Sequence, residues 1–224
     1  MQHTDGVNLF LLTVSGTVTG ANAEEVRELH NQTAGAEASV AGARALGDLS
    51  HNVYVPRMAG SREVLFLDTW TSAEGIGSFF SDPHVAQAAG QLFTEREATV
   101  WAPAPGCGDH HLPTPALRPV AALGILRVPV ISAEAAAKAF RTQGARVIAE
   151  ARKHGQVSRQ TYLRLAGPGS AEATELLSIE SWFDIDGMDR FYADDSNYEE
   201  FGGAFAGAPD TATWLPAPGE WREW

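Results

Sequence analysis

The chain has 224 residues, with 28 acidic against 16 basic side chains and a net charge of −12. This balance excludes the clustered basic residues that bind phosphates, so we expect no nucleic-acid partner and no anionic membrane partner. The only cysteine, Cys107, rules out an intramolecular disulfide. The sequence shows neither a signal-peptide pattern nor an apolar run long enough to cross a bilayer, and predicts a cytoplasmic protein.

The first half of the chain predicts four strands and two helices. Apolar, β-branched runs indicate the strands, Gly- and Ser-rich stretches indicate the turns, and polar caps mark where the helices begin. In chain order the signals are the run 9–18, the capping pair Asn22 and Glu25, a strand after Gly47, the turn 59–61, a strand at 64–71, a helix start at Ser72, and a final strand containing Trp101.

The second half repeats these signals in the same order. They are the run 120–130, the cap Ser132, a strand after Gly155, the turn 167–170, a strand at 175–183, a helix start at Asp184, and a final strand containing Trp214. Four segments echo each other at offsets of 108 to 113 positions: 47–55 and 155–163, 68–70 and 180–182, 79–82 and 191–194, 101–106 and 214–219. Such self-similarity indicates a duplicated domain.

Each half therefore predicts a β-α-β-β-α-β unit, the ferredoxin-like arrangement of an α+β protein. We place the first repeat at 1–106, a Pro- and Gly-rich linker at 107–119, and the second repeat with its aromatic tail at 120–224. A sheet with both helices on one face leaves the other face bare. Two such faces would pack into one intramolecular, pseudo-two-fold α+β barrel, giving a monomer with an internal pseudo-dimer or, with further association, a homodimer.

The segment Trp70-Thr71-Ser72, the helix after it, and the run Ser81-Asp82-Pro83-His84-Val85 resemble the antibiotic-biosynthesis-monooxygenase-like proteins of the dimeric α+β barrel superfamily. The resemblance covers nearly the whole chain, as two copies. It implies cofactor-independent oxidation of an aromatic or polyketide-like substrate, or haem binding, since both occur in the superfamily. The chain departs from the family pattern at Phe80 and Tyr192, where many members have a histidine.

Two carboxylates next to tryptophans are repeated in both halves. Because side chains alternate along a strand, Asp68 shares a face with Trp70, and Glu180 shares one with Trp182. A carboxylate buried against an indole has a raised pKa and could serve as a general base. The alternative is a solvent-facing carboxylate beside a tryptophan that only fills the core.

His51 in the first half is matched by Arg159 in the second. A neutral imidazole could transfer a proton near pH 7, and a guanidinium could hold an anionic substrate. We therefore take His51, Asp68 and Arg159 as the candidate catalytic residues. The alternative is that His51 and Arg159 are ordinary solvent-facing residues.

Further residues are candidates for contact with a substrate. His30 and Asn31, in the run 30–33 of the first helix, have no counterpart in the matching run 140–143, and Tyr54 is matched by Tyr162. The alternatives are a solvated helix face and two structural tyrosines. The candidate substrate-binding residues are Trp70, Tyr54, His30, Asn31, Trp182, Tyr162 and Glu180.

The linker residues Cys107, Asp109, His110 and His111 have metal-binding side chains but lack a recognisable ligand spacing, so no metal site is expected. Glycine motifs for nucleotides are absent as well.

We expect a small-molecule pocket protein, with a small apolar or aromatic ligand as its partner. The leading interpretation is a cofactor-independent, monooxygenase-like oxidoreductase. Its alternatives are a haem-binding relative, with His51, His30 or His84 as the axial ligand, and a non-catalytic binding or interaction module. The aromatic segment 219–224 has no equivalent in the first half and could cover a sheet edge or the mouth of a pocket.

Overall fold

The computed structural model describes residues 9–111, 120–165, 175–197 and 201–224. Its internal contacts divide the chain into a first unit, Met1–Ala102 with Ala217–Trp224, and a second unit, Pro103–Pro216. The aromatic segment thus belongs to the first unit, although it follows the second repeat in sequence. The main chain explains this, because Trp224 and His51 exchange two backbone hydrogen bonds of 2.7 and 3.2 Å.

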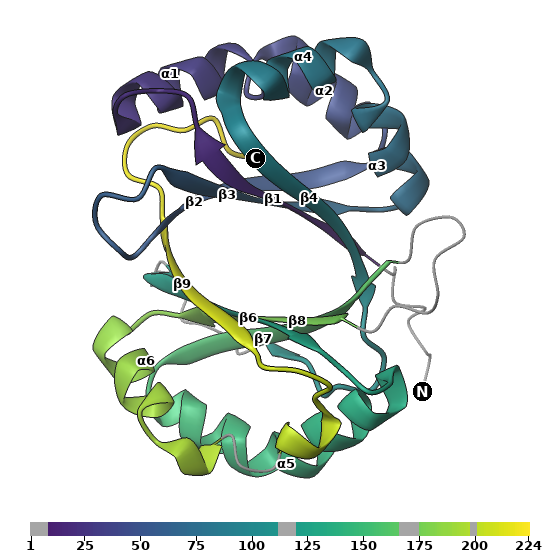
Figure 1. The fold of residues 1–224 in the computed structure, drawn as a ribbon, viewed down its shortest axis with the longest axis vertical. Coiled ribbons are helices and arrows are strands. Elements are labelled where there is room, and N and C mark those ends of the chain that lie inside the picture. Colours follow the sequence, from purple (N-terminus) through teal and green to yellow (C-terminus); the bar gives the residue numbers. More distant parts are fainter. Residues whose placement is uncertain (1–8, 112–119, 166–174, 198–200) are drawn as a thin grey trace. The chain divides into compact units, whose positions relative to one another are not determined.

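The first unit is a four-stranded antiparallel sheet in the order β4-β1-β3-β2, with helices on one face (Figure 1). Its elements are β1 (Phe10–Val18), α1 (Ala23–Gln32), α2 (Glu37–Ala45), β2 (Asp48–Pro56), β3 (Glu63–Trp70), α3 (Ala73–Phe80), α4 (Pro83–Leu92) and β4 (Phe93–Pro103). This strand order is the ferredoxin-like one that the element sequence predicts.

The second unit has the same arrangement, in the order β9-β6-β8-β7 with the short β5 beside β7. Its elements are β5 (His110–His111), β6 (Ala122–Pro129), α5 (Ala133–Lys153), β7 (Gln156–Arg164), β8 (Glu175–Trp182), α6 (Ile185–Tyr192), the 3₁₀ turns η1 (Asp195–Asn197) and η2 (Phe201–Ala204), and β9 (Asp210–Pro216). The predicted α+β class and element order are confirmed, while the turn predicted at 167–170 lies outside the described residues.

Helix caps explain part of the sequence repeat. The Asn22 side chain accepts from the amides of Glu24 and Glu25, and the Ser72 and Ser132 side chains cap α3 and α5 in the same way. The predicted first helix is divided into α1 and α2, because the chain turns at Thr33, whose amide bonds to the His30 carbonyl only three residues back.

The repeated glycines Gly47 and Gly155 have the same role in both units. Each follows a helix and takes a left-handed conformation, with φ of +104° and +96°, before the next strand begins. A glycine at this position ends a helix without the steric cost that a Cβ would add. The glycine that begins the segments 47–55 and 155–163 therefore ends the preceding helix.

Each unit has its own core between sheet and helices. In the first unit Trp70 and Val53 are almost fully buried, and Trp182 and Phe191 have the same burial in the second. Among the described residues no helix combines the length and apolarity needed to span a bilayer.

Candidate functional site

Each unit contains a cavity on the helix-covered face of its sheet. The cavity of the second unit has a volume of about 370 Å³, and that of the first unit about 80 Å³. Small-molecule sites generally span about 300–1,000 Å³, so the second unit has space for a ligand and the first unit has little. We call them the large cavity and the small cavity.

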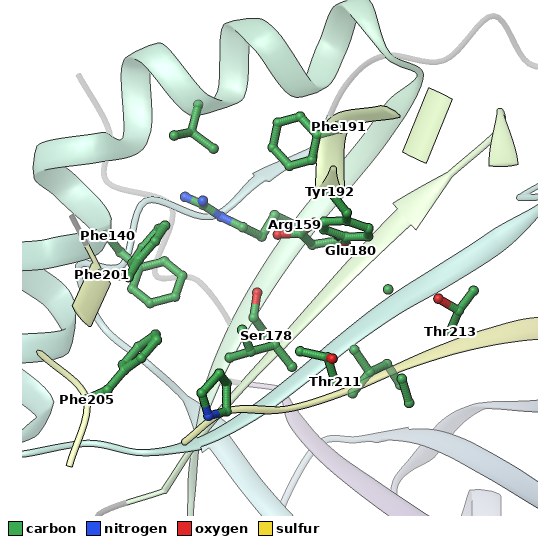
Figure 2. Close-up of a pocket in the computed structure, with 16 residues that line it drawn as sticks. Phe140, Arg159, Ser178, Glu180, Phe191, Tyr192, Phe201, Phe205, Thr211 and Thr213 are labelled. Atoms are coloured by element: carbon green, nitrogen blue, oxygen red, sulfur yellow. Dashed lines mark hydrogen bonds between the residues drawn. The ribbon is translucent and has the colours of Figure 1, made fainter. Parts of the chain in front are cut away.

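The large cavity has mainly apolar walls. Figure 2 shows Phe140, Phe201 and Phe205 together on one side, with Arg159, Glu180 and Tyr192 near one another and Ser178 pointing into the space. These side chains come from α5, β7, β8, α6 and η2 of the one unit and, for Phe205, from the segment that follows η2. Apolar walls with a few polar groups are typical of sites for small organic ligands.

Arg159, on β7, is the most unusual residue of this wall. Its side chain is only 2% exposed, its guanidinium lies 5.1 Å from the centre of the Phe140 ring, and its Nη2 donates long hydrogen bonds to the carbonyls of Cys107 (3.4 Å) and Gly108 (3.3 Å). The buried Nε has no partner among the described residues. A buried cation with an unused donor is costly unless an anion completes its contacts.

Glu180 faces Arg159 across the strand pair β7–β8. Burial raises the pKa of the Glu180 carboxyl above its usual value, against the opposing effects of Tyr192 and Arg159. The Tyr192 hydroxyl donates to Glu180 Oε2 at 2.7 Å. This contact depends on Gly124, because a Cβ at that position would collide with the Tyr192 hydroxyl. The second unit thus combines a cation, a carboxyl group and a phenol in one cavity.

Two exchanges between the repeats contribute to the different volumes. Phe66 and Ser178 occupy matching places, two residues before the carboxylates Asp68 and Glu180. Leu12 pairs with Asp68 where Gly124 pairs with Glu180. At both positions the first unit has a large side chain and the second unit has a small one. The smaller side chains leave space for the cavity of the second unit.

The first unit has a chain of hydrogen bonds in place of the large cavity. Asp68 Oδ1 lies 2.6 Å from His51 Nδ1, His51 Nε2 lies 2.9 Å from His30 Nε2, and His30 Nδ1 lies 3.0 Å from Asn31 Oδ1. His30 and His51 also stack, with ring centres 5.1 Å apart. All three ionisable side chains of this network are buried.

The direction of these hydrogen bonds follows from Asn31. Its Nδ2 donates to the carbonyl of Glu220 and its Oδ1 accepts from the amide of Arg222, both at 2.9 Å. Since Oδ1 is an acceptor, Nδ1 of His30 must carry a hydrogen. Burial and the charge of His51 lower the pKa of His30 to about 4, so this ring is neutral and its Nε2 has a lone pair.

It follows that His51 Nε2 donates to His30, and that a proton is shared between His51 Nδ1 and Asp68. Burial alone would lower the pKa of His51, but Asp68 and Asp48 raise it above its ordinary value. His51 is thus hydrogen-bonded on both sides, to the Asp68 carboxyl group and to His30. His51 matches Arg159 of the second unit. His51 pairs across the strands with Asp68, and Arg159 pairs in the same way with Glu180.

The predicted site residues are divided between the two cavities. His51, Asp68 and Trp70 line the small cavity, whereas Arg159 and Glu180 line the large one. His30 and Asn31 lie behind His51 in the hydrogen-bonded chain. Cross-strand pairing of His51 with Asp68, and of Arg159 with Glu180, agrees with the predicted matching of these positions.

Three of the predicted substrate contacts lie elsewhere. Tyr54 and Tyr162 follow His51 and Arg159 by three residues, so strand alternation directs them to the opposite face of the sheet. Burial raises the pKa of each of these phenols to about 12. Trp182 is 0% exposed and packs against Phe191 in the core, without lining the large cavity.

The linker side chains make structural contacts. Asp109 accepts from the amide and the hydroxyl of Thr161, and His110 Nε2 lies 2.9 Å from Gln156 Oε1. Within the described residues, no three His, Cys, Asp or Glu side chains are grouped so that they could hold a metal ion.

The three histidines that the sequence suggested as axial haem ligands, His30, His51 and His84, do not fit that role. None lines the large cavity, and both ring nitrogens of His30 and of His51 are already in hydrogen bonds. His84 is exposed at the start of α4. An axial ligand needs a ring nitrogen directed at the iron with space for the macrocycle, and none of these three side chains combines the two.

Sequence reasoning missed Asp48, Ser178 and Gly124, and it left open what the aromatic segment 219–224, which contains Trp224, would cover. A signal for Ser178 and Gly124 was present, because comparing matched positions of the two repeats shows large residues exchanged for small ones. Nothing in the sequence pattern places Trp224 beside His51, since that contact joins positions 173 residues apart.

No protein-family model and no curated protein sequence matches the chain. Solved structures do match it. An anthrone oxidase-like protein is 14% identical with a TM-score of 0.66, covering 96% of this chain and 93% of that one. A monooxygenase-like protein from Lactobacillus acidophilus is 12% identical with a TM-score of 0.61, covering 94% and 95%. A chlorite dismutase mutant from Candidatus Nitrospira defluvii is 10% identical with a TM-score of 0.53, covering 96% and 93%.

At these identities the likeness establishes the fold and no more. It extends over both units, and the neighbours include monooxygenase-like, anthrone oxidase-like and chlorite dismutase proteins. With two ferredoxin-like units in one chain, this protein has the fold of the dimeric α+β barrel superfamily.

Proposed function

We propose that the large cavity binds a small planar aromatic molecule with an anionic oxygen, and that the protein oxidises this molecule without a bound cofactor. The observation that carries the proposal is Arg159, whose buried Nε has no partner among the described residues and lies on the wall of a cavity of about 370 Å³. Ser178 Oγ, buried on the same wall, has no partner in that part of the chain either. An anion that also accepts from Ser178 would satisfy both groups.

The size and walls of the cavity favour two or three fused rings. Its volume lies near the lower limit for organic ligands, and the Phe140, Phe201 and Phe205 rings offer faces and edges for stacking. Of the neighbours, the anthrone oxidase-like protein suggests a substrate class that fits this description, a hydroxylated anthrone.

The proposed reaction begins with removal of a proton by Glu180. Burial raises its pKa, which makes the carboxylate a stronger base, and Tyr192 holds the carboxyl group in place. Arg159 stabilises the enolate oxygen that forms, as a fixed positive charge in an apolar site. The electron-rich ring then reduces dioxygen. The anthrone CH₂ loses two hydrogens and gains one oxygen atom to become a carbonyl, and the second oxygen atom leaves as water.

Substitutions of Arg159 and of Glu180 test the two parts of the proposal, ligand binding and oxidation, separately. With 1,8-dihydroxyanthrone as the probe, anaerobic calorimetry measures binding and an oxygen electrode measures turnover. Arg159→Met is expected to weaken binding about ten- to a hundredfold, the loss of one or two hydrogen bonds to a charged group. Glu180→Gln is expected to bind the probe but to lose oxygen consumption.

Arg164→Met is the matched control, since Arg164 is exposed and pairs with Glu175. Equal binding by wild type and Arg159→Met would overturn the assignment of the site. Tight, Arg159-dependent binding without oxygen consumption would overturn the oxidation and leave a binding module.

A further inference from the structure

We infer that the first unit has a second site for a planar aromatic ligand, which the Ala217–Trp224 segment occupies with the indole of Trp224. The ligand class that fits this site is a planar aromatic with a ring N–H or O–H donor, of the indole or phenol type. The inference concerns only the first unit and is independent of the function proposed for the large cavity.

The contacts of Trp224 are those of a bound aromatic ligand. Its ring stacks on His51, with centres 4.6 Å apart and planes 21° from parallel. Its Nε1 donates to Asp48 Oδ2 at 3.2 Å. An aromatic face stacked on a buried imidazole ring and a donor directed at a buried carboxyl group are the two elements that recognise an indole or a phenol.

The indole lies in the place that corresponds to the large cavity of the other repeat. His51 matches Arg159, Asp68 matches Glu180, and Phe79 matches Phe191. Trp224 lines the small cavity together with His51 and Asp68. Among the described residues of the second unit no segment corresponding to Ala217–Trp224 lines its cavity, which keeps a volume of about 370 Å³. The segment therefore fills, in one repeat, a site that is vacant in the other.

Two polar atoms beside the indole point to more than structural filling. Asp48 Oδ1 and Trp70 Nε1 are both buried and have no hydrogen-bond partner among the described residues, and both residues line the remaining space of about 80 Å³. Asp48 and Trp70 are direct cross-strand neighbours. An acceptor and a donor left unpaired side by side are costly in a core. A ligand with one more polar group than the tryptophan would pair with them.

The segment is held mainly by polar contacts outside the indole. Asn31 binds the main chain of Glu220 and Arg222, and the Glu223 carboxylate accepts from the Val53 amide at 2.6 Å. Trp221 packs against His30 but does not line the small cavity. Removing the Trp224 side chain therefore empties the site while these other anchors remain.

The test compares how many indole molecules bind to the wild type, Trp224→Ala and Trp221→Ala. Calorimetry with indole is expected to show one more bound molecule per chain for Trp224→Ala than for wild type, and to show no additional molecule for Trp221→Ala. Adding Asp48→Ala to Trp224→Ala is expected to weaken the additional binding about tenfold, through loss of the buried acceptor.

Indole should also raise the melting temperature of Trp224→Ala more than that of wild type, because a ligand stabilises the state that it binds. If Trp224→Ala does not fold, Trp224→Val keeps part of the apolar volume and takes its place in every comparison. A folded variant at position 224 that binds no additional indole would overturn the inference. Additional binding that Asp48→Ala leaves unchanged would overturn the assigned recognition.

Discussion

Asp48 offers a quantitative test of the polar environment in the first unit. Burial, followed by the charge of Asp68, raises its pKa from 3.8 to about 7. The residue is only 4% exposed, and its Oδ1 has no partner among the described residues while Oδ2 accepts from Trp224. We expect the carboxyl group to be protonated in the folded protein over much of the range from pH 4 to 7.

The sign of the effect follows from linkage. Between pH 4 and 7 the folded state holds a proton on Asp48 that the unfolded state has lost, so the free energy of unfolding falls as the pH rises through this window. Each unit of pKa difference is worth about 1.4 kcal/mol. Between pH 5 and pH 8 the wild type should therefore lose up to about 3 kcal/mol through this residue alone.

Asp48→Asn removes the titration and keeps an oxygen that can accept from Trp224. Urea unfolding at pH 5 and pH 8, followed by tryptophan fluorescence, gives the pH-dependent difference for each protein. The difference should be smaller in Asp48→Asn by up to about 3 kcal/mol. The exposed Asp186→Asn changes the charge by the same amount and should leave the difference as in the wild type. If Asp48→Asn and wild type lose stability equally between the two pH values, Asp48 is ionised in the folded state and the reasoning is wrong.

Three further predictions concern other parts of the two units. In ¹⁵N NMR spectra at pH 7, Nε2 of His51 should carry a hydrogen and Nε2 of His30 should not; the reverse pattern would contradict the hydrogen-bond direction set by Asn31. Gly124→Ala should displace the Tyr192 hydroxyl from Glu180 and weaken binding of 1,8-dihydroxyanthrone by about 1 kcal/mol. Gly90→Ala, whose added methyl group meets no atom within 4 Å, should leave that binding unchanged. Ser72→Ala should lower the free energy of unfolding by about 1 kcal/mol through loss of the α3 cap. Asp184→Ala, at a position without a side-chain cap bond, should cost less, and equal losses would show that the cap contributes nothing.

The sequence was sufficient for the element order, because each strand and helix is specified by local signals. Asn22, Ser72 and the glycines at 47 and 155 act within a few residues of their position, so their roles can be recognised without the fold. Strand alternation also identified the face that Asp68 shares with Trp70. These are the parts of a structure that depend on short-range geometry.

The composition of the two cavities depends on long-range packing and was predicted only in part. His51 and Arg159 were expected to act together, but each lines the cavity of its own unit. Whether a cavity is open depends on the volume of facing side chains, as at Phe66 and Ser178. Sequence periodicity indicates which face a residue occupies but not how much space its neighbours leave. The contact of Trp224 with His51 could not be inferred for the same reason.

The exchange of Leu12 for Gly124 has a consequence for how such a chain can change over generations. In a homodimer of identical subunits, one codon specifies both copies of a position, so any substitution alters two sites at once. Here the matched positions have separate codons, and a mutation that widens one cavity leaves the other as it was. Each repeat can therefore follow its own line of selection, one toward a new ligand and the other toward a more stable core.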